Sequence, residues 1–172
     1  MKVYTRTGDN GLTSLYDGSR VAKTEQIFDV LGALDELASH IGVLCSKYKH
    51  CREFLQFVQR KLLNIGSIIA TPSVDENTVL PTIQDEDVVR IENEIDELDE
   101  VLEPLTVFLI MDGVNEPSAY AHVCRTVCRR AERELEKYGN VDRTITRFAN
   151  RLSDYFFTLA RFTSEVSVVL VP

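Results

Sequence analysis

The sequence lacks several features that would place it at once in a class of proteins. Its four cysteines form no Cys-x-x-Cys pair, and His122, Cys124 and Cys128 do not have a usual zinc spacing. We therefore expect no protein metal site and interpret the cysteines as reduced, partly buried thiols of an intracellular protein. No apolar run approaches the length that crosses a membrane.

Two motifs of common cofactor sites are also missing. There is no Gly-x-x-x-x-Gly-Lys sequence, which excludes an ordinary P-loop, and no Glu-x-x-His sequence, which excludes the usual di-iron helical bundle. Motif-like sequence begins at Tyr4, so we expect no targeting peptide and a cytoplasmic protein. The alternative is a processed form in the mitochondrial or another organellar matrix.

Charge is distributed unevenly along the 172 residues, which carry a net charge of -8. The segment 84–104 holds ten acidic residues against Arg90 alone, so it accounts for -9 and leaves +1 for the rest. The sequence pI of about 4.9 argues against nonspecific nucleic-acid binding, although it leaves room for locally basic surfaces. A hydrophobic content of 44% suits one globular domain with a real core, over residues 1–172.

The first 24 residues are rich in Thr, Gly, Ser and Asp and predict a loop with short extended pieces. Apolar residues then recur at helical spacing and predict five helices, with the bundle covering residues 25–165. The clearest stripes are Ile27, Leu31, Leu34, Ala38, Ile41 and Cys45; Phe54, Val58, Leu62, Ile65 and Ile69; Val88, Ile91, Ile95, Leu98 and Leu102; and Ile145, Phe148, Leu152, Tyr155, Phe156 and Leu159. Short connections favour antiparallel neighbours. The predicted fold is an all-α, antiparallel five-helix bundle after an extended Gly/Thr-rich loop.

Local signals mark some helix ends. Thr82 with Asp85 resembles a capping box before the third helix. Asn115 and Pro117 suit the start of the fourth helix, and Gly139 suits its end.

The stretch "CRTVCRRAER", 124–133, places four arginines on the fourth helix. At roughly 100° per residue, Arg125, Arg129 and Arg133 share one face with Glu132 and Glu136, while the cysteines lie on the opposite, apolar side. One interpretation is a solvated surface held by Arg–Glu pairs, which are worth little. The other is a site for an anion or an interface.

Two further features favour a site. The fifth helix carries its own polar series: Arg147, Asn150, Arg151, Asp154 and Arg161. The loop "YTRTGDNGLTSL" contains Gly8 and Gly11, which let backbone N–H groups approach an anion closely, and Arg6 and Lys23 add positive charge. Together these features predict a nonstandard nucleoside-triphosphate site shared by the loop and two arginine-bearing helices.

Five segments resemble the PduO-type ATP:cob(I)alamin adenosyltransferases: "YTRTGDNGLTSL", "RVAK" (20–23), "LDEL" (34–37), "CRRAER" (128–133) and "NRLSDYFFTLAR" (150–161). The likeness is collinear from Lys2 to about Arg161. It implies a homotrimer with ATP bound at subunit interfaces, and Asp35 paired with Arg129 of a neighbouring subunit.

The resemblance also implies the site residues. ATP would be held by Thr5, Arg6, Thr7, Gly8, Thr13, Ser14, Lys23, Arg129, Arg130, Glu132, Arg133 and Asn150. Arg129 and Arg133 would be catalytic. Phe108 is the candidate for an apolar wall beside the corrinoid.

The implied reaction transfers the 5′-deoxyadenosyl group of ATP to the cobalt of reduced cob(I)alamin, giving adenosylcobalamin and triphosphate. The cofactor does the hard chemistry while the protein aligns the reactants, and Mg²⁺ would bridge the phosphates. Transient partners would be a cobalamin reductase or an adenosylcobalamin-dependent enzyme, with neither nucleic acid nor membrane involved.

One segment departs from the family pattern. Relatives commonly have a Pro-Gly-Gly-like turn where this chain reads "FLIMDGV", 108–114, which keeps only Gly113. This departure motivates an alternative function, a noncatalytic ATP- or corrinoid-binding regulator or chaperone on the same trimeric scaffold. A purely structural helical bundle is a third hypothesis, but it leaves the loop motif unexplained.

Overall fold

The structure is a computed structural model that describes residues 4, 6–73, 78–105, 109–111 and 115–164. Five long helices follow a small hairpin, which confirms the expected all-α bundle and the short extended pieces before it. The elements are β1 (Leu12–Ser14), β2 (Arg20–Ala22), α1 (Gln26–Lys47), α2 (Arg52–Ile69), α3 (Asp85–Asp99), α4 (Glu116–Tyr138) and α5 (Arg143–Thr163). Within the described part of the chain, no helix is long and apolar enough to span a membrane.

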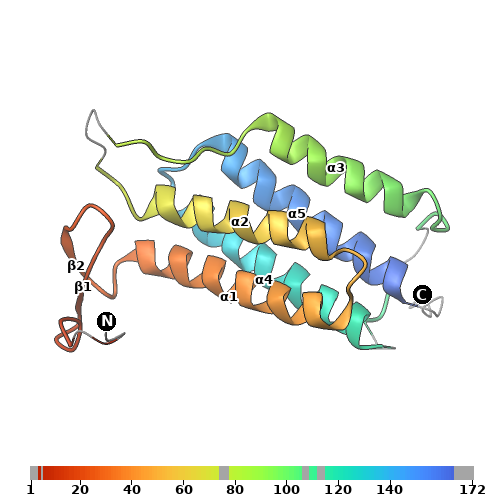
Figure 1. Cartoon of the computed structure of the whole chain (residues 1–172), viewed down its shortest axis with the longest axis horizontal. Coiled ribbons are helices and arrows are strands. Elements are labelled where there is room, and N and C mark those ends of the chain that lie inside the picture. The colour runs from red at the N-terminus through yellow and green to blue at the C-terminus, as the bar shows by residue number, and fades with distance from the viewer. Residues whose placement is uncertain (1–3, 5, 74–77, 106–108, 112–114, 165–172) are drawn as a thin grey trace.

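The helices alternate in direction along the sequence, so α1 is antiparallel to its neighbours α2 and α4, and α4 is antiparallel to α5, whereas α3 and α5 run parallel (Figure 1). α1 packs against α2 and α4, α4 packs against α5, and α5 packs against α3. The β1–β2 hairpin lies at the end of the bundle where α1 begins and α2 ends (Figure 1). It is tied there by the Tyr16 N–H, which donates to the Ala70 carbonyl at 3.0 Å.

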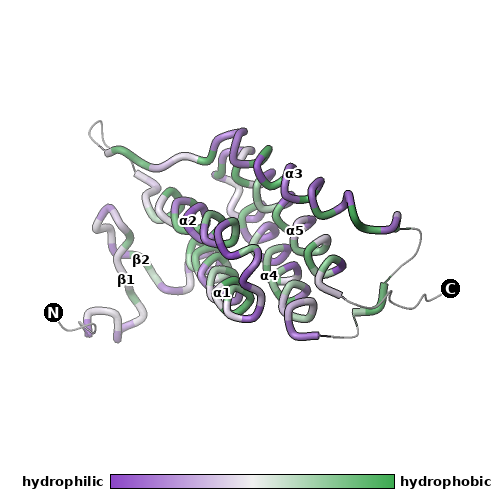
Figure 2. The backbone as a smooth tube through the Cα atoms, turned by 45° about the vertical axis from the view of Figure 1, so that its right-hand side comes forward, coloured by the Kyte–Doolittle hydropathy of each residue, from purple (hydrophilic) through white to green (hydrophobic). Residues whose placement is uncertain are grey.

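Most residues of the predicted apolar stripes form the core, while Leu31 and Ala38 of α1 and Ile95 and Leu98 of α3 are half-buried at its edge, and Leu102 lies beyond the end of α3. Every predicted stripe residue of α2 and α5 is buried, and Tyr155, Phe148 and Phe156 are the largest fully buried side chains. On α1 the buried face is wider than predicted, because this helix lies between α2 and α4 and also buries Val30 and Leu37. The alternation of hydrophilic and hydrophobic residues is visible along α3, which covers the edge of the bundle (Figure 2).

The helix ends follow the local signals with one exception. The Asn115 side chain accepts from the Ser118 N–H at 2.9 Å, and Gly139 ends α4 in the left-handed region at φ 73°. The predicted Thr82–Asp85 capping box is wrong. Instead Gln84 is the N-cap and its N–H donates to Asp87 at 2.9 Å, because the helix begins at Asp85.

The four cysteines are free thiols, and three of them, Cys45, Cys124 and Cys128, are buried. Burial raises the pKa of Cys51 to about 11 and that of Cys124 to about 12. It also raises the pKa of Cys128, whose thiol lies 3.2 Å from the Ala149 carbonyl that accepts its hydrogen bond. These thiols therefore pack the core as protonated groups.

Candidate functional site

The loop before α1 is a closed hairpin. β1 and β2 pair antiparallel, with Ser14 opposite Arg20. Gly18 makes the connecting turn at φ 83°, a left-handed conformation that favours glycine. Asp17 accepts from both the N–H and the hydroxyl of Ser19. The hairpin therefore fixes the backbone path of the loop residues that are predicted to bind a nucleotide.

The predicted loop residues lie before β1, within β1 and directly after β2. Arg6 adopts the left-handed region at φ 62°, which is uncommon for a residue with a side chain. A Cβ atom on Gly8 would lie 3.1 Å from Nζ of Lys23, so glycine lets the backbone pass directly beside that ammonium group. Thr7 and Ser14 are exposed and Thr13 is half-buried. Thr5 lies outside the described residues.

The arginine face of α4 is confirmed by the packing of its opposite side, where Cys124, Cys128 and Ala131 are buried. Arg129 and Arg133 are exposed one turn apart. Nη1 of Arg133 donates to the Arg129 carbonyl at 3.1 Å. In the described part of the chain, the Arg129 guanidinium has neither an ion pair nor a hydrogen bond.

The positive charges of Arg125 and Arg129 on this face repel each other. The pKa of Arg125 is lowered, first by burial and second by the positive charge of Arg129. The intrahelical Arg–Glu pairs of the solvated-surface interpretation do not form among the described residues: Glu132 instead accepts from Asn150 Nδ2 at 2.8 Å. The concentration of unpaired positive charge can attract a polyanion.

Arg130 faces a different helix from the other arginines. Its guanidinium forms an ion pair with Glu36 of α1. Asn150 of α5 contacts the arginine-bearing face through Glu132, whereas Arg130 is directed toward α1.

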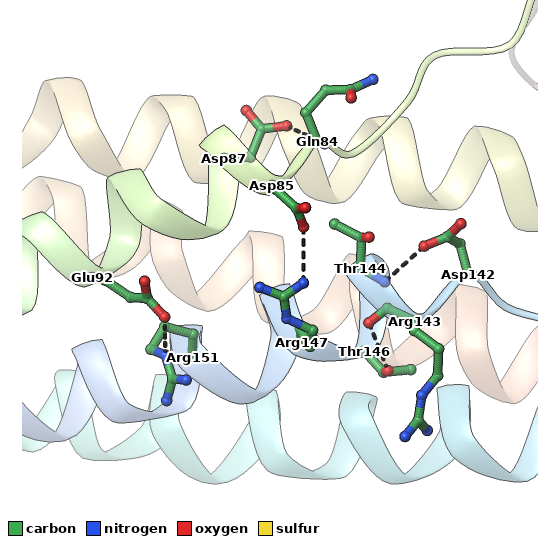
Figure 3. Close-up of polar contacts among 10 residues, drawn as sticks. All are labelled: Gln84, Asp85, Asp87, Glu92, Asp142, Arg143, Thr144, Thr146, Arg147 and Arg151. Carbon is green, nitrogen blue, oxygen red and sulfur yellow. Dashed lines mark hydrogen bonds and ion pairs between the residues drawn. The ribbon is translucent and has the colours of Figure 1, made fainter.

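Three of the four arginines of α5 lie toward α3, and Figure 3 shows two of them with their acidic partners. They pair with α3: Arg147 with Asp85 at 2.8 Å, Arg151 with Glu92 at 2.9 Å, and Arg161 with Asp99 at 3.5 Å. The hypothesis that α4 and α5 share a site or an interface stays a prediction, and these ion pairs give the three arginines carboxylate partners on α3. A signal was present in the sequence, since the three acids are seven residues apart and fall on one face of α3.

Asp35 is exposed on α1. It lines a pocket of about 300 Å³ between α1 and α2, whose other lining residues are mostly apolar. Two of these, Tyr16 and Leu63, are 76% and 71% exposed. Within the described residues of one chain, the Asp35 carboxylate has no ion pair or hydrogen bond, so its pairing with Arg129 of another subunit stays a prediction.

The candidate corrinoid residue Phe108 lies outside the described residues, as do residues 112–114 of the altered 111–114 turn. Beside them, Met111 is 50% exposed, and its sulfur lies 3.1 Å from Nη2 of Arg125. Among the described residues, no three His, Cys, Asp or Glu side chains come together as a metal site.

Comparison with known proteins gives one family. The family model described as cobalamin adenosyltransferase matches residues 3–163. The corrinoid adenosyltransferase MMAB of Bos taurus is 40% identical over 173 residues, covering 95% of this chain and 71% of the relative. A cobalamin adenosyltransferase of Cupriavidus metallidurans is 39% identical over 166 residues, covering 93% of this chain and 86% of the relative.

A solved structure agrees in fold. A variant of the PduO-type ATP:corrinoid adenosyltransferase from Lactobacillus reuteri, complexed with cobalamin and ATP, superposes with a TM-score of 0.88 at 30% identity. The match covers 95% of this chain and 93% of that one. The unpaired arginine face, the glycine-bearing hairpin and these matches agree, and the chain belongs to the cobalamin adenosyltransferase family.

Proposed function

We propose that the protein transfers the 5′-deoxyadenosyl group of ATP to the cobalt of a reduced corrinoid, releasing triphosphate. The observation that carries this proposal is the pair of exposed arginines, Arg129 and Arg133, neither of which has a carboxylate partner among the described residues. Guanidinium groups bind phosphate oxygens through parallel hydrogen bonds. Family membership supplies the reaction class.

The ATP-binding residues are proposed as two sets. The hairpin set is Thr5, Arg6, Thr7, Gly8, Thr13, Ser14 and Lys23. The helical set is Arg129, Arg130, Glu132, Arg133 and Asn150, with Arg129 and Arg133 stabilising the charge that develops on the departing triphosphate. Neither set is a complete cradle alone, so the site needs both.

A homotrimer with ATP between subunits accounts for the position of Asp35. An unpaired carboxylate at the rim of an apolar pocket, beside the exposed Leu63, suits cover by a second copy of this chain. Asp35 would then meet Arg129 of the neighbouring subunit. Closed cyclic assemblies of identical chains use heterologous contacts of this kind.

The remaining proposals concern other participants. Because the described residues offer no three-ligand metal site, Mg²⁺ would be bound chiefly by the phosphates. Phe108 would contact the corrinoid, and a cobalamin reductase or an adenosylcobalamin-dependent enzyme would be a transient partner. Four free thiols support an intracellular compartment, the cytoplasm or an organellar matrix.

An anaerobic assay with ATP and chemically reduced cobalamin tests the proposal. The expected result is formation of adenosylcobalamin and triphosphate. The change in the absorption spectrum of the corrinoid monitors the reaction. Binding of ATP without turnover would favour the noncatalytic regulator or chaperone instead. If the protein shows neither ATP binding nor turnover, the remaining hypothesis is a purely structural helical bundle.

A further inference from the structure

Arg20 holds three separate points of the nucleotide loop. Its guanidinium donates to the Thr7 carbonyl at 2.7 Å, to the Ser14 hydroxyl at 3.2 Å and to the Leu12 carbonyl at 3.5 Å. The guanidinium is rigid and has five N–H donors, so one side chain can bind several acceptors in a fixed geometry. Arg20 is not among the residues expected to touch ATP.

The bond to Thr7 determines where the next amide points. In a planar trans peptide the carbonyl and the following N–H point in opposite directions. Because the Thr7 carbonyl faces Arg20, the Gly8 N–H faces away from Arg20. Gly8 is also the residue that passes beside the Lys23 ammonium group.

Strand pairing places Arg20 for this role. Arg20 is opposite Ser14 in the β1–β2 register, and the Lys23 N–H donates to the Gly11 carbonyl at 2.9 Å, which closes the hairpin. A loop rich in glycine and hydroxyl residues otherwise loses much conformational entropy when it orders around a ligand. Contacts formed before binding reduce that cost.

We propose that Arg20 is a positioning residue that presets the 6–14 loop, with the Gly8 amide and the Lys23 ammonium disposed for phosphate, before ATP arrives. This inference rests on the proposed function, since it assumes that the loop binds ATP. It assigns to Arg20 an effect on ATP affinity without contact between Arg20 and the nucleotide.

Isothermal titration of ATP, without corrinoid, tests the inference with Arg20→Ala and Arg20→Lys. We expect Arg20→Ala to raise the Kd for ATP about tenfold, equivalent to about 1.4 kcal/mol. Arg20→Lys keeps the charge but cannot reach three acceptors, so its Kd should remain several-fold above wild type. In turnover, both variants should raise the KM for ATP and leave kcat nearly unchanged. Arg60→Ala, which removes an exposed positive charge from α2, is the matched control.

Amide hydrogen exchange of the nucleotide-free protein gives a second readout. Arg20→Ala should speed exchange in residues 6–14 and leave the five helices unchanged. An unchanged Kd in Arg20→Ala, or a wild-type Kd in Arg20→Lys, would overturn the inference. Failure of the wild-type protein to bind ATP would refute the proposed function instead, so the two results are distinguishable.

Discussion

At the scale of single residues, Arg133 separates catalysis from binding. Arg129 and Arg133 present neighbouring guanidinium groups, and negative charge grows on the triphosphate as the bond to C5′ breaks. Loss of one charge-assisted hydrogen bond costs about 1.5–3 kcal/mol, or roughly 10- to 100-fold in rate. Arg133→Ala should therefore lower kcat more than it raises the KM for ATP in steady-state assays.

Two variants sharpen this experiment. Arg133→Lys should recover part of the rate, because it restores the charge without the planar group. Arg143→Ala removes an exposed arginine from the start of α5 and should behave as wild type. An unchanged kcat in Arg133→Ala would show that Arg133 is a solvated residue of the helix surface without a catalytic role.

The buried thiols predict how stability depends on pH. Cys51 and Cys124 have raised pKa values, about 11 and about 12, against an ordinary value of 9.0. Above about pH 9 the unfolded chain ionises these thiols while the folded chain keeps them protonated, so the unfolded state is favoured as pH rises. Thermal unfolding should show Tm falling between about pH 9 and about pH 11.

Cys51→Ala isolates one thiol in that experiment. The variant starts from a different Tm because packing changes, but its Tm should fall less steeply with pH than that of wild type. Parallel curves for the two proteins would contradict the assignment.

At the scale of elements, the α3–α5 ion pairs are expected to support the fold and not the site. Arg151 contacts both Glu92 and Asp154 at the surface. Exposed pairs contribute about 0.2–1 kcal/mol each and are screened by salt. Arg151→Ala should lower the free energy of unfolding by about 1 kcal/mol at low salt and by less at high salt, measured in urea.

The same variant distinguishes the two views of α5. If the ion pairs are structural, the KM for ATP stays at the wild-type value in Arg151→Ala. If Arg151→Ala raises the KM for ATP as much as a variant of the α4 face such as Arg129→Ala does, Arg151 would belong to the nucleotide site.

The elements also show which parts of the molecule were predictable. Helix identity, the ends marked by Asn115 and Gly139, and the burial of Cys124 follow from local spacing, so sequence suffices for them. The partner of Arg147 depends on which helices become neighbours, and spacing within one helix does not determine that. The hydrogen bond from Arg20 to the Thr7 carbonyl likewise depends on the register of the hairpin. The pattern of polar and apolar residues does not determine that register in so short a loop.

At the scale of the whole molecule, Asp35 tests the assembly. Sedimentation of the wild-type protein at micromolar concentration should show a trimer. Asp35→Ala removes the proposed partner of Arg129 across the interface and should shift the equilibrium toward smaller species with loss of activity. Asp35→Asn keeps the shape and should weaken assembly less if the pocket contributes most of the contact.

The outcome that would contradict this prediction is specific. A stable wild-type monomer with full activity would mean that one chain completes the site. Wild-type assembly and activity in Asp35→Ala would instead reduce Asp35 to a surface charge.

The pairing of α3 with α5 has a consequence for stoichiometry. The acidic residues of α3 form ion pairs with Arg147, Arg151 and Arg161. Without these pairs, the three arginines would offer a polyanion a second binding surface. If the nucleotide binds at the α4 arginines as proposed, internal neutralisation of these competing cations would favour one phosphate chain per site, in addition to the shape of the site itself. The acidic residues that dominate the charge of this chain would then direct the nucleotide to the α4 arginines, as the proposed function requires.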